Sequence, residues 1–168
     1  MIRDRAASEI RRTRIVLRVA TSTGLARTFT ARGLGAAALA LLEGGANPAL
    51  IYRIYAADRG AAPAIIDEDG VIDFATLWER IRRFAGALER RGVGRGDTVL
   101  VTLKNRVEFV VAQNAAALVG GAAVTASFHA TTSELEYLAS HARARVAVVE
   151  AERAHDLRRI LGPSGPVV

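Results

Sequence analysis

Few residues of this 168-residue sequence combine a reactive side chain with a spacing that chemistry needs. The histidines His129, His141 and His155 lie 12 and 14 residues apart, so no two share the one-turn spacing of a helical metal site. The absence of cysteine excludes disulfides, iron–sulfur clusters and thiol nucleophiles. A lone histidine is usually a satisfied polar residue, but His129 follows a predicted strand, where open α/β sheets place their sites.

Three loops have the composition of ligand-binding loops in the wrong context. Gly92–Gly96 follows a predicted helix and precedes a strand, whereas a phosphate loop follows a strand and opens a helix. Thr21–Gly24 has neither a preceding strand nor a lysine shortly after it. Asp67–Asp73 holds three aspartates near the spacing of a calcium loop, but Val71 occupies the third ligand position. We predict turns or breaks at all three places and assign no catalytic, cofactor-binding or metal-binding residue.

The elements that would position any site alternate between helix and strand from residue 75 onward. Ala75–Arg91 is the clearest helix, because its apolar residues recur at steps of four and three and form one stripe. The strands expected are Thr98–Leu103, Ala122–Ala126 and Arg145–Glu150, and the helices expected are Val107–Val119, a helix with a Thr131–Glu134 capping box, and Glu152–Leu161. This order predicts an α/β fold with a partial, doubly wound, mostly parallel sheet and flanking helices.

A different organisation is predicted before residue 75. Asn47 and Pro48 predict the start of a helix that runs to Asp58, and Ala64–Asp67 and Val71–Phe74 predict strands joined by an Asp-Gly turn. Residues 1–46 are rich in alanine and arginine and predict a helical extension, with helices at Ser8–Ala20 and Ala31–Glu43. We therefore divide the chain into this extension (residues 1–46) and an incomplete α/β subdomain (residues 47–168). The subdomain ends in a Pro- and Gly-rich stretch and two valines, which is typical of a linker that enters another strand.

The net charge of +6 lies entirely in the extension. Residues 1–32 contain eight arginines and two acids, so the remainder of the chain is neutral. A folded domain without a basic face argues against nucleic-acid binding. The extension either packs on the rest of the chain or forms a basic amphipathic arm, residues 1–45, on an anionic membrane surface. No run approaches the roughly 18 apolar residues of a membrane span, and we find no export signal, so we expect a cytoplasmic protein with peripheral membrane contact as the alternative.

Six sequence pieces occur in one order between Asn47 and Glu150. They are P-A-I-I-D, F-x-x-L, A-L-x-x-x-G-V-x-x-G-D-x-V, L-x-N-x-x-E-F, a small-residue helix that ends in Gly-Gly, and E-L-x-Y-L. Together they resemble the N-terminal region of the AMP-forming acyl-CoA synthetases, within the adenylate-forming ligases. The sequence departs from the family pattern at Lys104, where proline is usual, and at Val124–Phe128, where V-P-x-N-P is usual. The basic two-helix extension resembles that of fatty-acyl members.

The resemblance implies a ligase that joins a small-molecule carboxylic acid to ATP, with magnesium, and then passes the acyl group to CoA. The family's phosphate loop, its adenine- and ribose-binding motifs and its catalytic lysine do not occur between Met1 and Val168. We therefore expect an N-terminal fragment that needs no cofactor of its own and is inactive alone. The alternative is a stand-alone interaction or assembly module, because a sheet cut within a domain exposes an edge that needs a partner. A second copy of the chain is one such partner.

Overall fold

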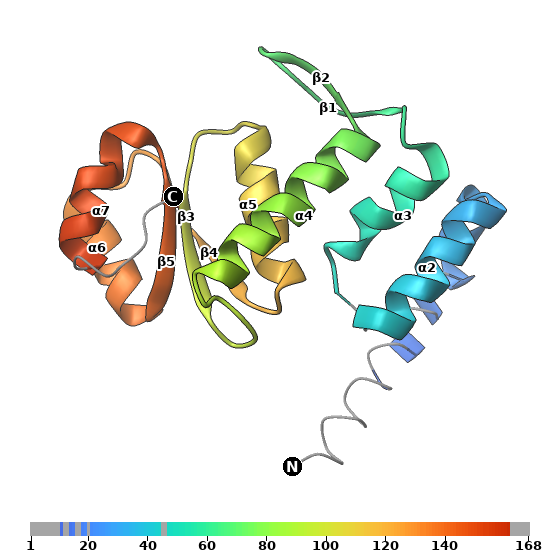
Figure 1. Ribbon diagram of the computed structural model, residues 1–168, viewed down its shortest axis with the longest axis horizontal. Helices are drawn as coiled ribbons and strands as arrows, with labels where there is room; N and C mark the ends of the chain where they lie inside the picture. Colours follow the sequence, from blue (N-terminus) through green and yellow to red (C-terminus); the bar gives the residue numbers. More distant parts are fainter. Residues whose placement is uncertain (1–10, 12–13, 16–17, 20, 45–46, 162–168) are drawn as a thin grey trace. The chain divides into compact units, whose positions relative to one another are not determined.

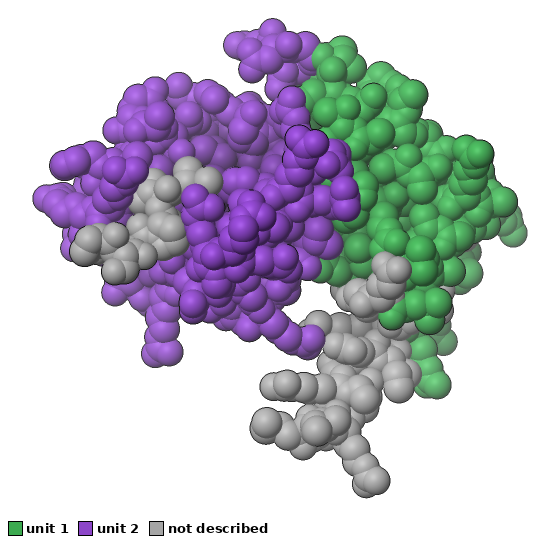
Figure 2. Space-filling view, viewed as in Figure 1, with its two compact units in different colours: residues 1–66, 71–78 green, residues 67–70, 79–168 purple. Residues whose placement is uncertain are grey.

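The computed structural model describes residues 21–44 and 47–161, together with residues 11, 14, 15, 18 and 19. It divides into two compact units, one of residues 1–66 and 71–78 and one of residues 67–70 and 79–168 (Figure 2). The units are described separately below. None of the helices in the described part of the chain is long and apolar enough to cross a lipid bilayer.

The first unit is built around two helices. The short helix η1 (Leu25–Thr28) precedes α2 (Ala31–Gly44), which packs against α3 (Leu50–Arg59; Figure 1). Ala40, Ala49 and Leu50 are buried. The helix expected at Ala31–Glu43 is confirmed. The expected helix at Ser8–Ala20 lies largely outside the described residues.

The expected helix start, with Asn47 as the cap and Pro48 in the first turn, was wrong by two residues. The Asn47 side-chain oxygen accepts the N–H of Ala49 at 2.9 Å, and the N–H of Leu50 reaches the Asn47 carbonyl at 3.1 Å. These bonds make a turn, so α3 begins only at Leu50. The asparagine thus satisfies local donors as predicted, but it opens a turn instead of capping the helix.

A hairpin and a long helix connect the two units. Strands β1 (Pro63–Asp67) and β2 (Gly70–Asp73) pair as a separate two-stranded sheet. Their turn confirms the expected Asp-Gly signal, with Gly70 at φ 128° and the Asp69 N–H donating to Asp67 Oδ1 at 3.0 Å. Helix α4 (Phe74–Arg90) follows. In its predicted stripe Leu77, Ile81 and Leu88 are fully buried, and Phe84 is half-buried.

The second unit contains a three-stranded parallel sheet. Its order is β4 (Ala122–Thr125), β3 (Thr98–Thr102) and β5 (Ala144–Val149), with Val99 opposite both Ala123 and Val146. The helices of this unit besides α4 are α5 (Val107–Leu118), α6 (Thr132–His141), the short η2 (Ala151–Arg153) and α7 (Ala154–Leu161). The predicted α/β class, with a parallel sheet flanked by helices, is confirmed (Figure 1).

Helices cover both faces of this sheet, which explains the nearly continuous apolar strands. On one face Val99 and Val101 pack in a cluster with residues of α4 and α5. On the other face Leu100 packs in a cluster with residues of α6 and α7. Because successive side chains of a strand point to opposite faces, the middle of β3, from Val99 to Val101, is apolar at every position.

The end of α4 and the beginning of α6 have the local structures that the sequence predicts. Gly92 adopts φ 77° directly after α4, so the glycine-rich segment is a helix-to-strand turn, as predicted. Thr131 and Glu134 form the predicted capping box of α6: the Thr131 hydroxyl accepts the Glu134 N–H, and the Glu134 carboxylate accepts the Thr131 N–H at 2.7 Å.

Candidate functional site

The carboxyl ends of the three parallel strands meet at one edge of the sheet in the second unit. The chain continues there as the loops 103–106 and 126–131, and as Glu150 followed by the short helix η2. Open α/β sheets place ligand sites at this edge. His129, the histidine singled out by sequence, lies in the second of these loops, four residues beyond β4.

Glu150 fastens the end of β5 to the end of β3. One carboxylate oxygen accepts the backbone N–H of Lys104 at 2.9 Å, and the other lies 3.5 Å from the guanidinium of Arg106. The Glu150 side chain is 11% exposed. The Glu150 carboxylate therefore holds the turn between β3 and α5 in position.

The loop after β4 is held by three hydrogen bonds from other segments and by one within the loop. The hydroxyl of Thr102, a buried polar residue of β3, donates to the Ser127 carbonyl at 3.1 Å. Arg153 donates to the carbonyls of Phe128 and Ala130. The Ser127 hydroxyl accepts the N–H of His129 at 3.2 Å. The loop that carries His129 is thus fixed mainly through its backbone.

A small cationic and aromatic cluster remains at this edge. The ring centroids of Phe128 and His129 are 3.7 Å apart, and the Lys104 ammonium lies 6.0 Å from the Phe128 ring centroid. At that distance a cation–π contact is weak. Lys104 is the only lysine of the sequence, so a phosphate bound at this end of the sheet could pair with one ammonium group of the chain.

An apolar groove of about 590 Å³ lies between α4 and the carboxyl end of β5. Its lining includes Phe84, Leu103, Val111 and Val148. The cationic side chains of its lining each have a carboxylate beside them: Arg80 lies 3.9 Å from Glu108, Arg83 2.8 Å from Glu79, and Arg106 3.5 Å from Glu150. The groove offers apolar surface but little uncompensated positive charge.

A second hollow in this unit and the glycine-rich turn also lack the features of an anion site. A hollow of about 710 Å³ at the end of β4 is lined by residues that include Ser127, His129, Glu134 and Tyr137. In the glycine-rich turn, the N–H of Gly94 donates to the Asp97 carboxylate at 2.9 Å, so this amide is already used. The described residues contain no cluster of three or more histidine, aspartate or glutamate side chains that could hold a metal ion.

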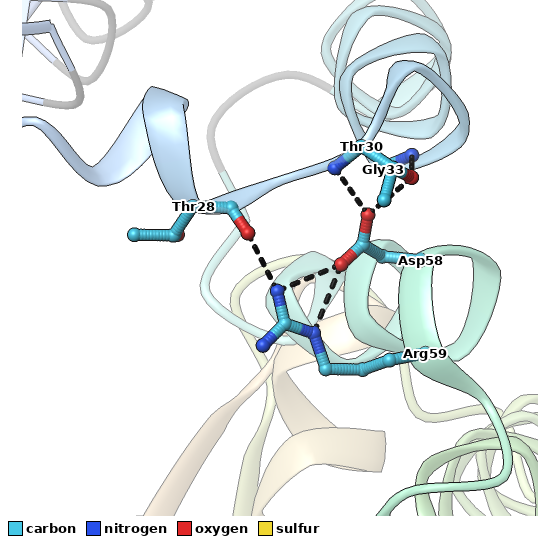
Figure 3. A network of polar contacts seen from close by, with 5 residues as sticks. All are labelled: Thr28, Thr30, Gly33, Asp58 and Arg59. Carbon is cyan, nitrogen blue, oxygen red and sulfur yellow. Dashed lines mark hydrogen bonds and ion pairs between the residues drawn. The ribbon is translucent and has the colours of Figure 1, made fainter.

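The most connected polar cluster of the first unit is structural. Asp58 Oδ1 accepts both the N–H and the hydroxyl of Thr30 at 2.6 Å (Figure 3). Arg59 binds the other Asp58 oxygen at 2.8 Å and donates to the Thr28 carbonyl at 2.6 Å. The Thr30 hydroxyl, with smaller contributions from its N–H and from Arg59, holds the pKa of Asp58 below its usual value. The cluster fastens α3 to the segment that enters α2, and a side chain at Gly33 would collide with Asp58.

Sequence comparison decides the family. The model of the AMP-binding enzyme family matches residues 53–166. The chain belongs to the AMP-binding enzyme family. The match includes all of the second unit's described helices and strands. In the first unit it begins within α3, so the first three residues of that helix lie before it.

Individual relatives of this AMP-binding chain are acyl-CoA and aryl-CoA ligases. It is 38% identical over 115 residues to 4-coumarate–CoA ligase 3 of Oryza sativa subsp. japonica, covering 67% of this chain and 21% of that protein. It is 44% identical over 73 residues to acetyl-coenzyme A synthetase of Burkholderia mallei (strain SAVP1), covering 40% of this chain and 11% of that protein. The chain thus spans about a fifth or less of the length of these relatives.

Solved structures share the fold. The benzoate CoA ligase from Burkholderia xenovorans LB400 matches with a TM-score of 0.64 and 26% identity, covering 72% of this chain and 27% of that chain. Apo MatB from Rhodopseudomonas palustris matches with a TM-score of 0.61 and 28% identity, covering 66% and 22%. The AMP-binding fold is therefore shared over most of the present chain.

Sequence reasoning missed Glu150 and Arg153, which shape the carboxyl edge. Glu150 was expected as the last residue of a strand, and a carboxylate directly after a buried strand was a usable signal. The sequence gives no signal for Arg153, because its partners are backbone carbonyls of a loop more than 20 residues away. Any residue in that loop could supply a backbone carbonyl.

Proposed function

We propose that this chain is part of an AMP-forming acyl-CoA ligase, which activates a carboxylic acid with ATP and passes the acyl group to CoA. The match to the AMP-binding family over residues 53–166 is the observation that carries the proposal. The relatives 4-coumarate–CoA ligase 3 and acetyl-coenzyme A synthetase support the reaction class, because their names differ in the acid and share CoA.

In this proposal the chain is a structural part of the ligase, and the nucleotide is bound by other residues of the longer protein. A triphosphate needs several cations or amides directed at its oxygens. In the described residues, the arginines at the groove are paired with carboxylates, Arg153 donates to loop carbonyls, and Lys104 is the only lysine of the sequence. These residues do not fit ATP with magnesium, so we derive no chemical step through them and propose that the 168-residue chain alone is inactive.

We further propose a fatty acid as the acid that is activated. The basic helical extension of residues 1–46 favours this choice, since it resembles that of fatty-acyl members. In keeping with the absence of cysteine, we place the protein in the cytoplasm.

Pyrophosphate release tests the reaction and the acid together. The 168-residue chain and the product of the complete coding sequence are each incubated with ATP, magnesium, CoA and one of four acids: acetate, benzoate, 4-coumarate or a long-chain fatty acid. We expect release only from the longer product and fastest with the fatty acid. Release by the 168-residue chain contradicts its inactivity, a preference for another acid contradicts the fatty-acyl proposal, and no release with any acid contradicts the ligase.

A second function is favoured by exposed apolar residues in the extension. Ile15 and Val19 lie one helical turn apart and are 56% and 50% exposed, and Leu42 of α2 is 84% exposed. Exposed arginines lie at positions 11, 14 and 18. Apolar and basic side chains exposed together are typical of segments that bind an anionic membrane surface. We propose such peripheral contact for residues 1–45.

Liposome co-sedimentation tests this contact. Vesicles with phosphatidylserine should sediment the chain, and vesicles of phosphatidylcholine alone should not. The double variant I15S/V19S should lose binding, while V71S, which changes an equally exposed valine of the hairpin, should bind as the parent does. Equal binding of both variants would remove the membrane proposal.

The alternative of a stand-alone assembly module, or of a homo-oligomer, is tested by size-exclusion chromatography of the 168-residue chain. A monodisperse folded species favours a module, and its mass tells a monomer from an oligomer. Aggregated or molten material favours a part of a larger fold.

A further inference from the structure

Helix α2 is apolar on the face that its neighbours leave exposed. A helix that packs on one side usually carries charged or polar residues on the other side. From residue 34 to residue 42, however, every exposed position of α2 is leucine, alanine or glycine: Leu34, Gly35, Ala38, Leu39 and Leu42. The three leucines are 45%, 46% and 84% exposed. The helix therefore has a second apolar face, for which the described part of the chain supplies no cover.

These five residues form one continuous surface, the outer face of α2. Leu34, Ala38 and Leu42 follow one another at steps of four residues, and Gly35 and Leu39 form a second row beside them. At 100° per residue all five lie within an arc of about 140°. The opposite side of the helix packs against α3 (Figure 1). The buried residues of α2 lie on that opposite side, so the two faces are distinct.

The charged side chains near the outer face are basic. The described residues from position 11 to position 42 include no acidic residue and five arginines, all exposed: Arg11, Arg14, Arg18, Arg27 and Arg32. The last two lie in η1 and in the first turn of α2. An anionic bilayer complements both features, because its headgroups attract arginine and its acyl chains accept leucine.

A second copy of the chain fits the outer face less well. In a two-fold dimer each copy meets the same residues of the other copy. The arginines of the two extensions would then approach one another, and like charges facing each other across an interface are unfavourable. A stable interface also buries roughly 800 Å² on each partner, and five residues that include an alanine and a glycine expose less than this.

The length of α2 determines how it can meet a bilayer. Its 14 residues extend over about 21 Å, whereas the hydrocarbon core is about 30 Å thick. The helix is therefore too short to cross the membrane, in agreement with the absence of a spanning helix among the described residues. Because its other face packs against α3, the outer face enters lipid only when α2 lies along the membrane surface.

We propose that α2 lies flat in the interface of an anionic lipid bilayer, with its outer face among the acyl chains and α3 on the water side. The inference rests on the peripheral contact proposed above for residues 1–45 and deepens it by naming the surface that inserts. The arginines bring the extension to the headgroups, an attraction that salt screens. The leucines then hold it through burial of apolar surface, which salt does not screen.

A fluorophore that responds to its surroundings tests the insertion. The sequence has no cysteine, so Ala38→Cys places a single label on the outer face of α2, and Ala57→Cys places a matched label at an exposed alanine of α3. With vesicles of phosphatidylserine and phosphatidylcholine, the first label should shift to the blue and be quenched by bromine atoms on the acyl chains. The second label should do neither. Equal responses at the two positions overturn the proposal.

Paired variants test the contribution of the leucines. L34S/L42S should lower the partition coefficient onto these vesicles at least about tenfold, because two exposed leucines no longer enter lipid. I66S/V71S changes two hairpin side chains that are 74% and 62% exposed and should partition as the parent chain does. Circular dichroism checks that both variants are folded. Equal partitioning of the two folded variants contradicts insertion of the outer face.

The same measurements separate this inference from the other proposals. Sedimentation with vesicles but without a blue shift of the first label overturns insertion and leaves peripheral contact standing, whereas absence of sedimentation overturns both. A blue shift without vesicles that grows with chain concentration identifies a second copy as the occupant. The same shift without vesicles in the product of the complete coding sequence identifies another part of that protein, and each of these two results overturns the proposal. No nucleotide or acid is present, so the proposed ligase reaction is tested independently.

Discussion

Replacing Thr131 by alanine tests how the beginning of α6 is held. In the native chain the Thr131 hydroxyl accepts the Glu134 N–H at 3.3 Å and donates to the Glu134 carboxylate at 2.9 Å, and alanine removes both bonds. Loss of a threonine N-cap destabilises a protein by about 1 kcal/mol. The Thr131 N–H would still reach Glu134 at 2.7 Å, so the loss should not exceed the usual range.

Urea unfolding followed by circular dichroism measures this loss. T131A should lower the free energy of unfolding by about 1 kcal/mol, and amides in the first turn of α6 should exchange faster. T131S keeps the hydroxyl and should behave as the parent. The capping argument is refuted if T131A leaves the free energy of unfolding unchanged, or if T131S is destabilised as much as T131A.

The same variant has a pH signature. The pKa of Glu134 is held below its usual value, chiefly by the Thr131 N–H and then by the hydroxyl. A carboxylate with a lowered folded-state pKa contributes stability that is present above its unfolded pKa and is lost as pH falls through the folded pKa. The difference between parent and T131A should therefore shrink on acidification.

Two further predictions concern the first unit and the glycine-rich turn. Asp58→Asn removes a carboxylate whose pKa is lowered mainly by the Thr30 hydroxyl, so the parent should lose stability as pH falls below about 4, and the variant should lose less in urea titrations over that range. Gly92→Ala places a side chain at φ 77° and should cost about 1–2 kcal/mol in urea unfolding. Gly94→Ala meets no neighbouring atom and should cost less than about 0.5 kcal/mol; similar losses in both variants would contradict the conformational argument.

Elements with a strong local signal could be predicted from the sequence. Leu77, Ile81 and Leu88 recur at helical spacing, and all three are buried along α4. The Thr131–Glu134 capping box depends on residues three apart, so the sequence alone contains what is needed to recognise it. The helix start near Asn47 failed because the asparagine side chain can satisfy either a helix or a turn, and the two choices look alike in the sequence.

The contacts that shape the carboxyl edge could not be predicted in the same way. Lys104 and Glu150 meet across 46 residues because β3 and β5 are neighbours, and the alternation of strands and helices does not give the strand order. The family, in contrast, could be inferred from six short pieces in a fixed order, because each piece is local in the sequence.

The DNA sequence downstream of the Val168 codon tests the central claim most directly, because we propose that the nucleotide-binding residues of the ligase lie outside the 168-residue chain. The account predicts a Ser/Thr/Gly-rich phosphate loop with a lysine there, in frame or after a frameshift. Unrelated sequence in every frame would contradict the assignment of this chain to an acid-activating ligase.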